Sequence, residues 1–71
     1  MLATGVDSGL TAREIDVLQS ISHGSSNAVI ATDLFISVPT VKSHVSSILR
    51  KLNADNRVQA LSIARERGLL I

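Results

Sequence analysis

The 71-residue sequence contains no cysteine, which excludes disulfide scaffolds and thiolate metal sites. It also lacks any apolar run near the roughly 18 residues that a membrane span requires. The first residues show no charged segment followed by an apolar one, the pattern of a secretion signal. From these absences we expect a soluble, cytoplasmic protein without membrane contact.

A strong net charge is missing too, because seven Lys and Arg against six Asp and Glu leave a formal charge of +1. The charges are nevertheless uneven along the chain. Residues 1–37 contain one cation against four acids, a net charge of −3, whereas residues 38–71 contain six cations against two acids, a net charge of +4. Such polarity can guide a polyanion onto one face of the domain, although ordinary charge scatter in a short chain explains it equally well.

The sequence does contain enough apolar material for one small folded domain. Hydrophobic residues make up 45% of the chain and charged residues 18%, a composition typical of a globular core. Residues 1–9 are small or polar and show no periodicity, so we expect a flexible leader or a linker remnant there. The folded domain is then residues 10–71.

Local signals predict two helices in the first half of this domain. Thr11 and Glu14 have the spacing of a capping box, and a helix at about 12–23 follows it. Gly24 is placed to end that helix in the left-handed conformation. The polar residues 25–27 then offer N-cap side chains to a second, short helix.

Two more helices are predicted in the second half, and no segment has a strand pattern. Ser37 is a natural N-cap, and Pro39 fits the first turn of a third helix at about 38–52. Asp55 is the expected cap of a fourth helix at 56–67. The predicted fold class is therefore all-α, with four helices.

The third helix has two contrasting faces. At about 100° per residue, one arc is apolar and the opposite arc carries short hydroxyls and one cation. The apolar arc is Val41, Val45, Ile48, Leu49 and Leu52, and the polar arc is Ser43, Ser46, Ser47 and Arg50, with Thr40 and Lys42 beside it. Short polar side chains let a helix backbone approach another molecule closely, whereas a plain solvated face favours long Glu and Lys.

A short helix, a tight turn and an amphipathic second helix are the parts of a helix-turn-helix unit. The residues themselves resemble the LuxR-type (GerE-like) helix-turn-helix domain over nearly all of 10–70. The matching segments are LTARE at 10–14, GSSN at 24–27, IA at 30–31, Leu34, IS at 36–37, TVKSHV at 40–45, KL at 51–52, Arg57 and GLL at 68–70. This resemblance implies a four-helix DNA-binding domain that dimerises and places its third helix in the major groove.

The resemblance also implies a set of DNA contacts. Base contacts are expected from Lys42, Ser43 and Ser46, and phosphate contacts from Thr40 and from the start of the second helix at Ser26 and Asn27, which are also its caps. Their places on the third helix make Ser47 and Arg50 further candidates for phosphate contacts. An ammonium such as that of Lys42 can donate to guanine O6 and N7. The alternatives are an ordinary solvated lysine at 42 and, for Arg50, a cation that only complements the helix dipole. Similar domains often have a cation at positions 28 and 46, so this sequence is poorer in them.

The fourth helix has more apolar surface than one core face needs. By resemblance, we expect a homodimer contact through Val58, Leu61, Ser62 and Arg65, the alternative being one broad core face. The resemblance also suggests that Glu14 pairs with Lys51 or Arg57. Similar domains are usually the output part of response regulators in two-component systems, so an upstream receiver or ligand-binding domain is expected as a partner.

Catalysis is not supported by the sequence. No serine stands in a nucleophile motif, and His23 and His44 are not at a metal-ligand spacing. We therefore expect no enzyme activity, no metal and no cofactor. The two function hypotheses are a sequence-specific transcription regulator that binds double-stranded DNA and a helix-turn-helix module used mainly for protein–protein interaction.

Overall fold

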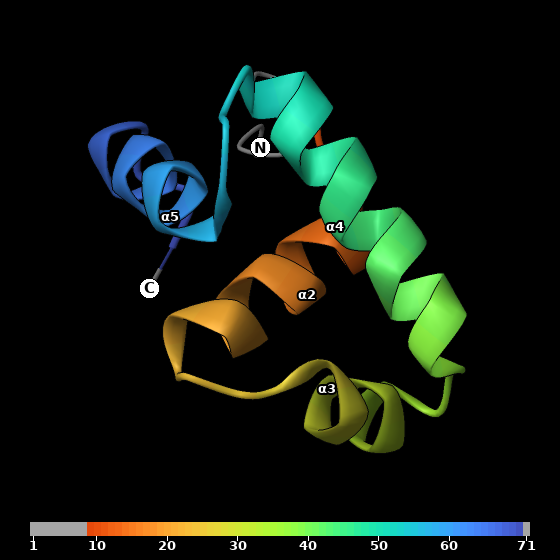
Figure 1. The fold of residues 1–71 in the computed structure, drawn as a ribbon. Helices are drawn as coiled ribbons and strands as arrows, with labels where there is room; N and C mark the ends of the chain where they lie inside the picture. Colours follow the sequence, from red (N-terminus) through yellow and green to blue (C-terminus); the bar gives the residue numbers. More distant parts are fainter. Residues whose placement is uncertain (1–8, 71) are drawn as a thin grey trace.

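The computed structural model describes residues 9–70, and these form four helices and no strand. In chain order the helices are α2 (Ala12–Ser22), α3 (Asn27–Leu34), α4 (Val38–Leu52) and α5 (Arg57–Glu66) (Figure 1). The all-α fold is thus confirmed, and α2, α4 and α5 begin and end within one residue of their predicted ranges. The expected flexible leader falls on residues 1–9, of which 1–8 lie outside the described residues.

The first three helices begin at side chains that the sequence marks as caps. The Thr11 side chain accepts from the Glu14 amide, and the Glu14 carboxylate accepts from the Thr11 amide, which completes the capping box. Ser26 caps α3 and Ser37 caps α4 in the same way. Gly24 follows α2 with a φ of 83°, the left-handed conformation predicted for it.

The predicted cap of α5 is wrong by one residue. Asn56, not Asp55, is the N-cap, and its side chain accepts from the Gln59 amide at 2.9 Å. The side-chain oxygen of Gln59 in turn accepts from the backbone N–H of Asp55. Adjacent Asp and Asn residues are nearly equal as caps, so the choice is made by the path of the chain after α4.

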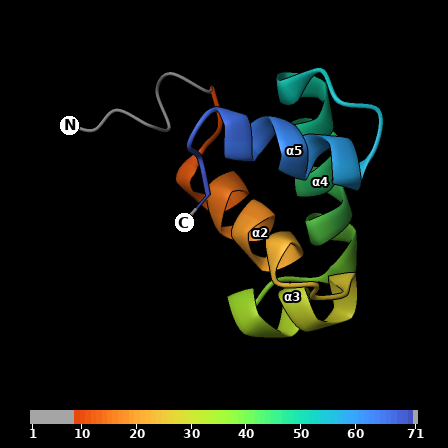
Figure 2. The same ribbon diagram turned by 90° about the vertical axis from the view of Figure 1, so that its left-hand side faces the viewer.

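The core lies around α4, which contacts all three other helices. Val41, Val45, Ile48 and Leu52 are its buried side chains, four of the five residues predicted for the apolar arc, and Leu49 is half-buried. Figure 2 shows α3 and α5 at opposite ends of the molecule, with α2 beside α4 between them. Within the described residues, no helix combines the length and apolar character needed to cross a membrane.

Two turns use the left-handed conformation without glycine. Phe35 (φ 58°, ψ 43°) ends α3, and Asn53 (φ 55°, ψ 44°) ends α4. Asn adopts this conformation readily, whereas other side chains such as Phe cost about 1–2 kcal/mol there. Behind Phe35 the amide of Ile36 donates to the carbonyl of Ala31 at 3.0 Å, the bond of a Schellman cap. Phe35 itself is 95% exposed, so core packing does not compensate its strain.

The position of the α5 cap gives a stability test. Asn56→Ala removes the acceptor for the Gln59 amide and should lower the free energy of unfolding by about 1 kcal/mol. Asp55→Ala is the matched control and should change it by less than about 0.5 kcal/mol, as exposed substitutions usually do. Urea unfolding followed by helical circular dichroism measures both. A larger loss in Asp55→Ala than in Asn56→Ala would contradict this assignment.

Candidate nucleic-acid interface

The polar face of α4 is solvent-accessible. Lys42, Ser43, Ser46 and Arg50 are all exposed, on the side of the helix away from the buried stripe. Ser46 is four residues from Lys42, three from Ser43 and four from Arg50. Residues at these spacings lie next to one another on the surface of a helix. In the described chain no acidic side chain pairs with Lys42 or Arg50, whose charges therefore face solvent. We call these four residues the outer face of α4.

The beginnings of α3 and α4 are organised by their caps. Ser26 is exposed, and its hydroxyl accepts from the Val29 amide at 3.2 Å. At α4 the Ser37 hydroxyl accepts from the Thr40 amide at 3.2 Å and is hydrogen bonded to the Thr40 hydroxyl at 2.8 Å. The first amides of a helix have no intrahelical partner, so the start of α3 can donate to an anion, whereas at α4 Pro39 has no N–H and the Thr40 amide is capped by Ser37.

Asn27 and Arg57 join the start of α3 to the start of α5. The guanidinium of Arg57 donates to the side-chain oxygen of Asn27, and both residues are half-buried. The sequence left Arg57 as one of two candidate partners for Glu14, and this contact assigns it elsewhere. The oxygen of Asn27, a predicted phosphate-contact residue, is therefore already engaged within the protein.

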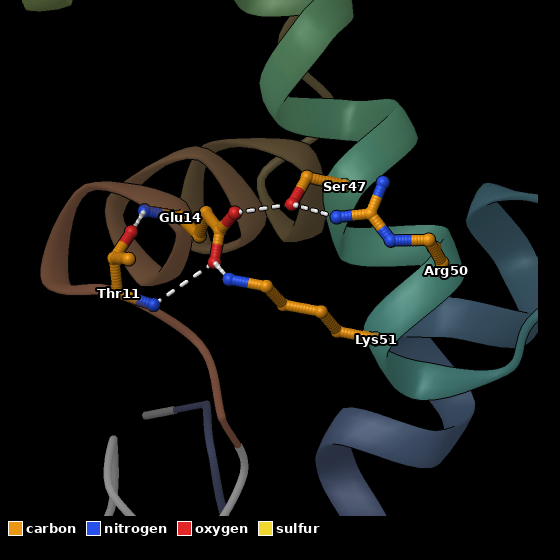
Figure 3. A network of polar contacts seen from close by, with 5 residues as sticks. All are labelled: Thr11, Glu14, Ser47, Arg50 and Lys51. Carbon is orange, nitrogen blue, oxygen red and sulfur yellow. Dashed lines mark hydrogen bonds and ion pairs between the residues drawn. The ribbon is translucent and has the colours of Figure 1, made fainter.

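Glu14 is the centre of a polar network between α2 and α4 (Figure 3). It is only 4% exposed, yet both carboxylate oxygens have donors. Oε1 accepts from the Thr11 amide at 2.9 Å and from Nζ of Lys51 at 2.8 Å, and Oε2 accepts from the Ser47 hydroxyl at 2.6 Å. The pairing with Lys51, one of the two options from the sequence, is thus present in the structure.

Burial and hydrogen bonding act on Glu14 in opposite directions. Burial raises the pKa of its carboxyl, but the hydrogen bonds from Lys51, Ser47 and the Thr11 backbone outweigh it and lower that pKa from 4.5 to about 2. Glu14 is therefore ionised at neutral pH and neutralises Lys51. Of the cations on α4, Lys51 is the one whose charge is balanced by a carboxylate within the network.

The sequence suggested that Ser47 belongs to the outer face of α4, but in the structure it does not. It is half-buried, and its hydroxyl hydrogen is donated to Glu14. Its oxygen also accepts from Nη2 of Arg50 at 3.5 Å, a long contact on the exposed side. The residue that sequence reasoning placed against phosphate thus connects the buried carboxylate to Arg50. The one feature of the sequence that indicated a contact between Ser47 and Glu14 is the position of Ser47 four residues before Lys51, which places both on the same side of α4.

The predicted dimer residues on α5 divide into two groups. Val58 is 78% exposed, and Ser62 and Arg65 are exposed as well, whereas Leu61 packs partly against the core. The chain's own core therefore does not cover Val58. Arg65 also lines an open hollow of about 320 Å³ together with Ser22, His23 and Leu70.

The two histidines have separate places, and neither joins a cluster. His23 is the C-cap of α2, and His44 is half-buried on α4. The described residues contain no group of three His, Asp or Glu side chains that could hold a metal ion.

The turn at residues 35–37 joins α3 to α4, whose outer polar face is free, and this arrangement defines a protein of the helix-turn-helix class. Comparison with known proteins extends the assignment. The family model described as "Bacterial regulatory proteins, luxR family" matches residues 8–64. The chain belongs to this family.

Curated relatives and a solved structure agree with the family. The glycerol metabolism activator of Pseudomonas putida is 54% identical over 73% of this chain and 24% of its own length. The nitrate/nitrite response regulator homologue of Haemophilus influenzae is 55% identical over 72% of this chain and 24% of its own length. The crystal structure of the response regulator ChrA, from a haem-sensing two-component system, matches with a TM-score of 0.80 at 47% identity, covering 83% of this chain and 29% of ChrA.

The relatives are regulators of transcription and not enzymes. The chain spans only about a quarter of the length of most of the curated relatives that it matches, and 8% of one of them. It corresponds to one domain of such proteins, the one that carries the helix-turn-helix unit.

The Glu14 network predicts a pH dependence of stability. Because the pKa of Glu14 is lower in the folded state than its ordinary value of 4.5, the stabilisation is complete above about pH 5 and is lost as pH falls towards 2. The two pKa values imply a loss of about 2 kcal/mol in the free energy of unfolding between pH 7 and pH 3. Urea unfolding of the wild type and Glu14→Gln at both pH values measures this loss, which should be much smaller in the variant.

Asp16→Asn is the control for this measurement, because it removes a carboxylate from the exposed side of the same helix. It should keep the wild-type difference between the two pH values. If Glu14→Gln and the wild type lose the same stability on acidification, the network does not hold the carboxylate as described.

Proposed function

We propose that this domain binds double-stranded DNA sequence-specifically, as a dimer, with α4 in the major groove. The observation that carries the proposal is the division of α4 between a buried apolar stripe and an exposed face of Lys42, Ser43, Ser46 and Arg50. Membership of a family of bacterial regulatory proteins supports it. A regulator of bacterial transcription acts where the chromosome is, so we also place the protein in the cytoplasm.

In this arrangement base reading is assigned to three residues of α4. Lys42 donates to guanine O6 and N7, and the hydroxyls of Ser43 and Ser46 contact neighbouring base edges. Because serine side chains are short, the backbone of α4 lies deeper in the groove than a helix lined by Lys or Glu would. Because α4 lies this deep, its few cations are sufficient for contacts with the bases.

Phosphate contacts flank these bases. At the start of α3 the first amides that Ser26 does not cap, together with the Asn27 side chain, donate to one phosphate, and Thr40 at the start of α4 contacts another. Arg50 contacts a third phosphate, while Ser47, whose hydrogen is donated to Glu14, takes part by holding the Arg50 guanidinium. Such contacts fix the register of α4 on the duplex without selecting a sequence.

Dimerisation compensates for the low charge. With Lys51 neutralised by Glu14, α4 presents two unpaired cations, Lys42 and Arg50. Each neutralised phosphate adds about 0.9 to the slope of log affinity against log salt, so one copy gains little from counterion release. Two copies linked through Val58, Ser62 and Arg65 of α5, with Leu61 beneath, bind two half-sites together and gain effective concentration.

An upstream domain fits the same proposal. The relatives described above are about three times as long as this chain, and two of them are response regulators by name. We infer that the domain is the output part of a longer regulator, joined to a receiver or ligand-binding domain that controls dimerisation.

The function is tested by selecting bound sites from random DNA and then measuring the effect of Lys42→Ala on them. The selected sites should contain an inverted pair of half-sites. Lys42→Ala should weaken binding to them by about 1–3 kcal/mol and relax the preference at one base pair of each half-site, because a direct base contact is lost. Fluorescence anisotropy on the selected site and on single-base variants measures both effects.

Random DNA is the control in that measurement. An equal loss of affinity for selected and random DNA would make Lys42 a phosphate contact only. If no sequence is enriched, or if binding does not weaken with salt, the domain serves protein–protein interaction instead, since phosphate neutralisation must release counterions.

The dimer contact on α5 has its own test. Val58→Arg places four charges at the centre of a two-fold contact, two from the new side chains and two from Arg65, and should reduce the DNA-bound species to one copy per half-site. Sedimentation velocity on DNA gives the stoichiometry. Glu66→Gln, an exposed change on the same helix, is the control and should leave two copies bound. A Val58→Arg variant that still binds as a pair would refute the contact.

A further inference from the structure

The contact between Arg57 and Asn27 joins two helices that lie far apart in the molecule. Figure 2 shows α3 and α5 at opposite ends, and the Arg57 guanidinium at the start of α5 donates to the side-chain oxygen of Asn27, the first residue of α3. Both residues are half-buried. In the proposed function the Asn27 side chain contacts phosphate, whereas Arg57 has no part. The contact therefore connects a residue of the proposed DNA interface to one outside it.

The stability of α5 does not account for a cation at position 57. Arg57 is the first residue of that helix, where the free amides leave a partial positive charge, and the first turn contains no acidic residue to balance it. A cation is least favourable at this end of a helix. Half-burial adds a cost for the charge that leaves water. The role of Arg57 is therefore to be sought in its contact with Asn27.

The chemistry of the two groups fixes the orientation of the Asn27 amide. A carboxamide has an oxygen that only accepts and an NH2 group that only donates, and a half-turn of the amide exchanges their places. A guanidinium has five donors and no acceptor. Only the oxygen of Asn27 can therefore face Arg57, which turns Nδ2 the opposite way.

The Nδ2 group of Asn27 is accessible from outside the protein. In the described part of the chain this side chain is hydrogen bonded through its oxygen alone, and no buried side-chain nitrogen or oxygen there lacks a partner. Nδ2 must therefore reach solvent. It lies beside the first amides of α3, which Ser26 leaves free because its hydroxyl accepts from the Val29 amide. The amide orientation thus adds a donor to the donors of the helix start.

We propose that Arg57 is a positioning residue of the DNA interface, which holds the Asn27 oxygen so that Nδ2 donates to the phosphate at the start of α3. The inference rests on the proposed DNA-binding function. The opposite orientation of the amide would place an oxygen with a partial negative charge against the phosphate. Arg57 excludes that orientation and contacts no phosphate itself.

The test is a double-mutant cycle of Asn27→Ala and Arg57→Gln in the whole chain, with affinity for the selected DNA site measured by fluorescence anisotropy. Asn27→Ala should weaken binding by about tenfold per half-site, as loss of a hydrogen bond to a charged group does. Gln offers the amide both a donor and an acceptor, so Arg57→Gln no longer selects an orientation and should weaken binding by a smaller factor. Because Arg57 acts through Asn27, the double variant should bind as Asn27→Ala alone does.

The salt dependence separates positioning from a direct phosphate contact. A cation that neutralises a phosphate contributes about 0.9 to the slope of log affinity against log salt. Arg57→Gln should leave this slope unchanged, because the contact that it weakens is that of a neutral amide. Arg67→Gln is the control for net charge, since it removes an exposed cation at the other end of α5, and it should bind as the wild type does.

Two further measurements do not depend on the stability of Arg57→Gln. Arg57→Lys replaces one group that only donates with another, so it should keep the amide orientation and most of the affinity. In the wild type, the NMR signals of the Asn27 side-chain NH2 should shift when the duplex is added. Urea unfolding checks that each variant is folded at the temperature of the binding measurements.

The outcomes that overturn the inference differ from those that overturn the function. If the wild type binds no DNA, the proposed function has failed, and the positioning role with it. If it binds DNA but Arg57→Gln binds equally well, or the NH2 signals of Asn27 do not shift, the positioning role alone is overturned. Additive losses in the double variant, or a slope lowered by about 0.9 in Arg57→Gln, would make Arg57 a phosphate contact and refute its action through Asn27.

Discussion

The contact between α2 and α4 depends on a carboxylate that the fold takes out of water. Removing a charge from water costs several kcal/mol, so Glu14 is tolerable only because Thr11, Ser47 and Lys51 supply donors to both its oxygens. Two of these donors lie on α4 and one precedes α2. The two helices are therefore held in one register, because a slip along either axis would leave the carboxylate buried without hydrogen-bond partners.

That register divides the side chains of α4 into three groups. The apolar stripe faces the core, Ser47 and Lys51 face Glu14, and Lys42, Ser43, Ser46 and Arg50 remain outside. The composition of the last group therefore depends on helical periodicity and equally on the Glu14 network, which keeps Ser47 and Lys51 out of it. Arg50 connects the exposed group to the group that faces Glu14, because its guanidinium donates to the Ser47 oxygen from the exposed side.

Sequence reasoning predicted well those features that neighbouring residues decide. The capping box at Thr11 and Glu14, the Ser37 cap and the buried stripe of α4 follow from spacings of three or four residues. The resemblance to a known family added Lys51 or Arg57 as the partner of Glu14. The structure has the pairing with Lys51, a contact 37 residues apart in the chain that no local rule could provide. Fold class and helix boundaries are therefore encoded locally, in caps and in helical periodicity.

The features that sequence reasoning missed depend on contacts between distant segments or on the path of the backbone. Helical periodicity placed Ser47 with the outer serines, because period alone does not tell an outward hydroxyl from one that reaches a buried carboxylate on another helix. Arg57 bonds to Asn27, 30 residues away, instead of Glu14. Asp55 and Asn56 are equivalent caps by composition, and only the chain path decides between them.

The scarcity of surface cations on α3 and α4 has a consequence for how such a domain binds DNA. A helix-turn-helix unit with many cations gains more affinity from counterion release than a unit with few. Here Glu14 consumes one cation of α4, and α3 supplies none. In the proposed function, affinity then comes from a linked contact, that of a second copy on the adjoining half-site. Each such contact can be weak, because the DNA supplies the effective concentration. Weak, linked contacts also make occupancy depend steeply on the state of the partners, which is the property a regulated switch requires.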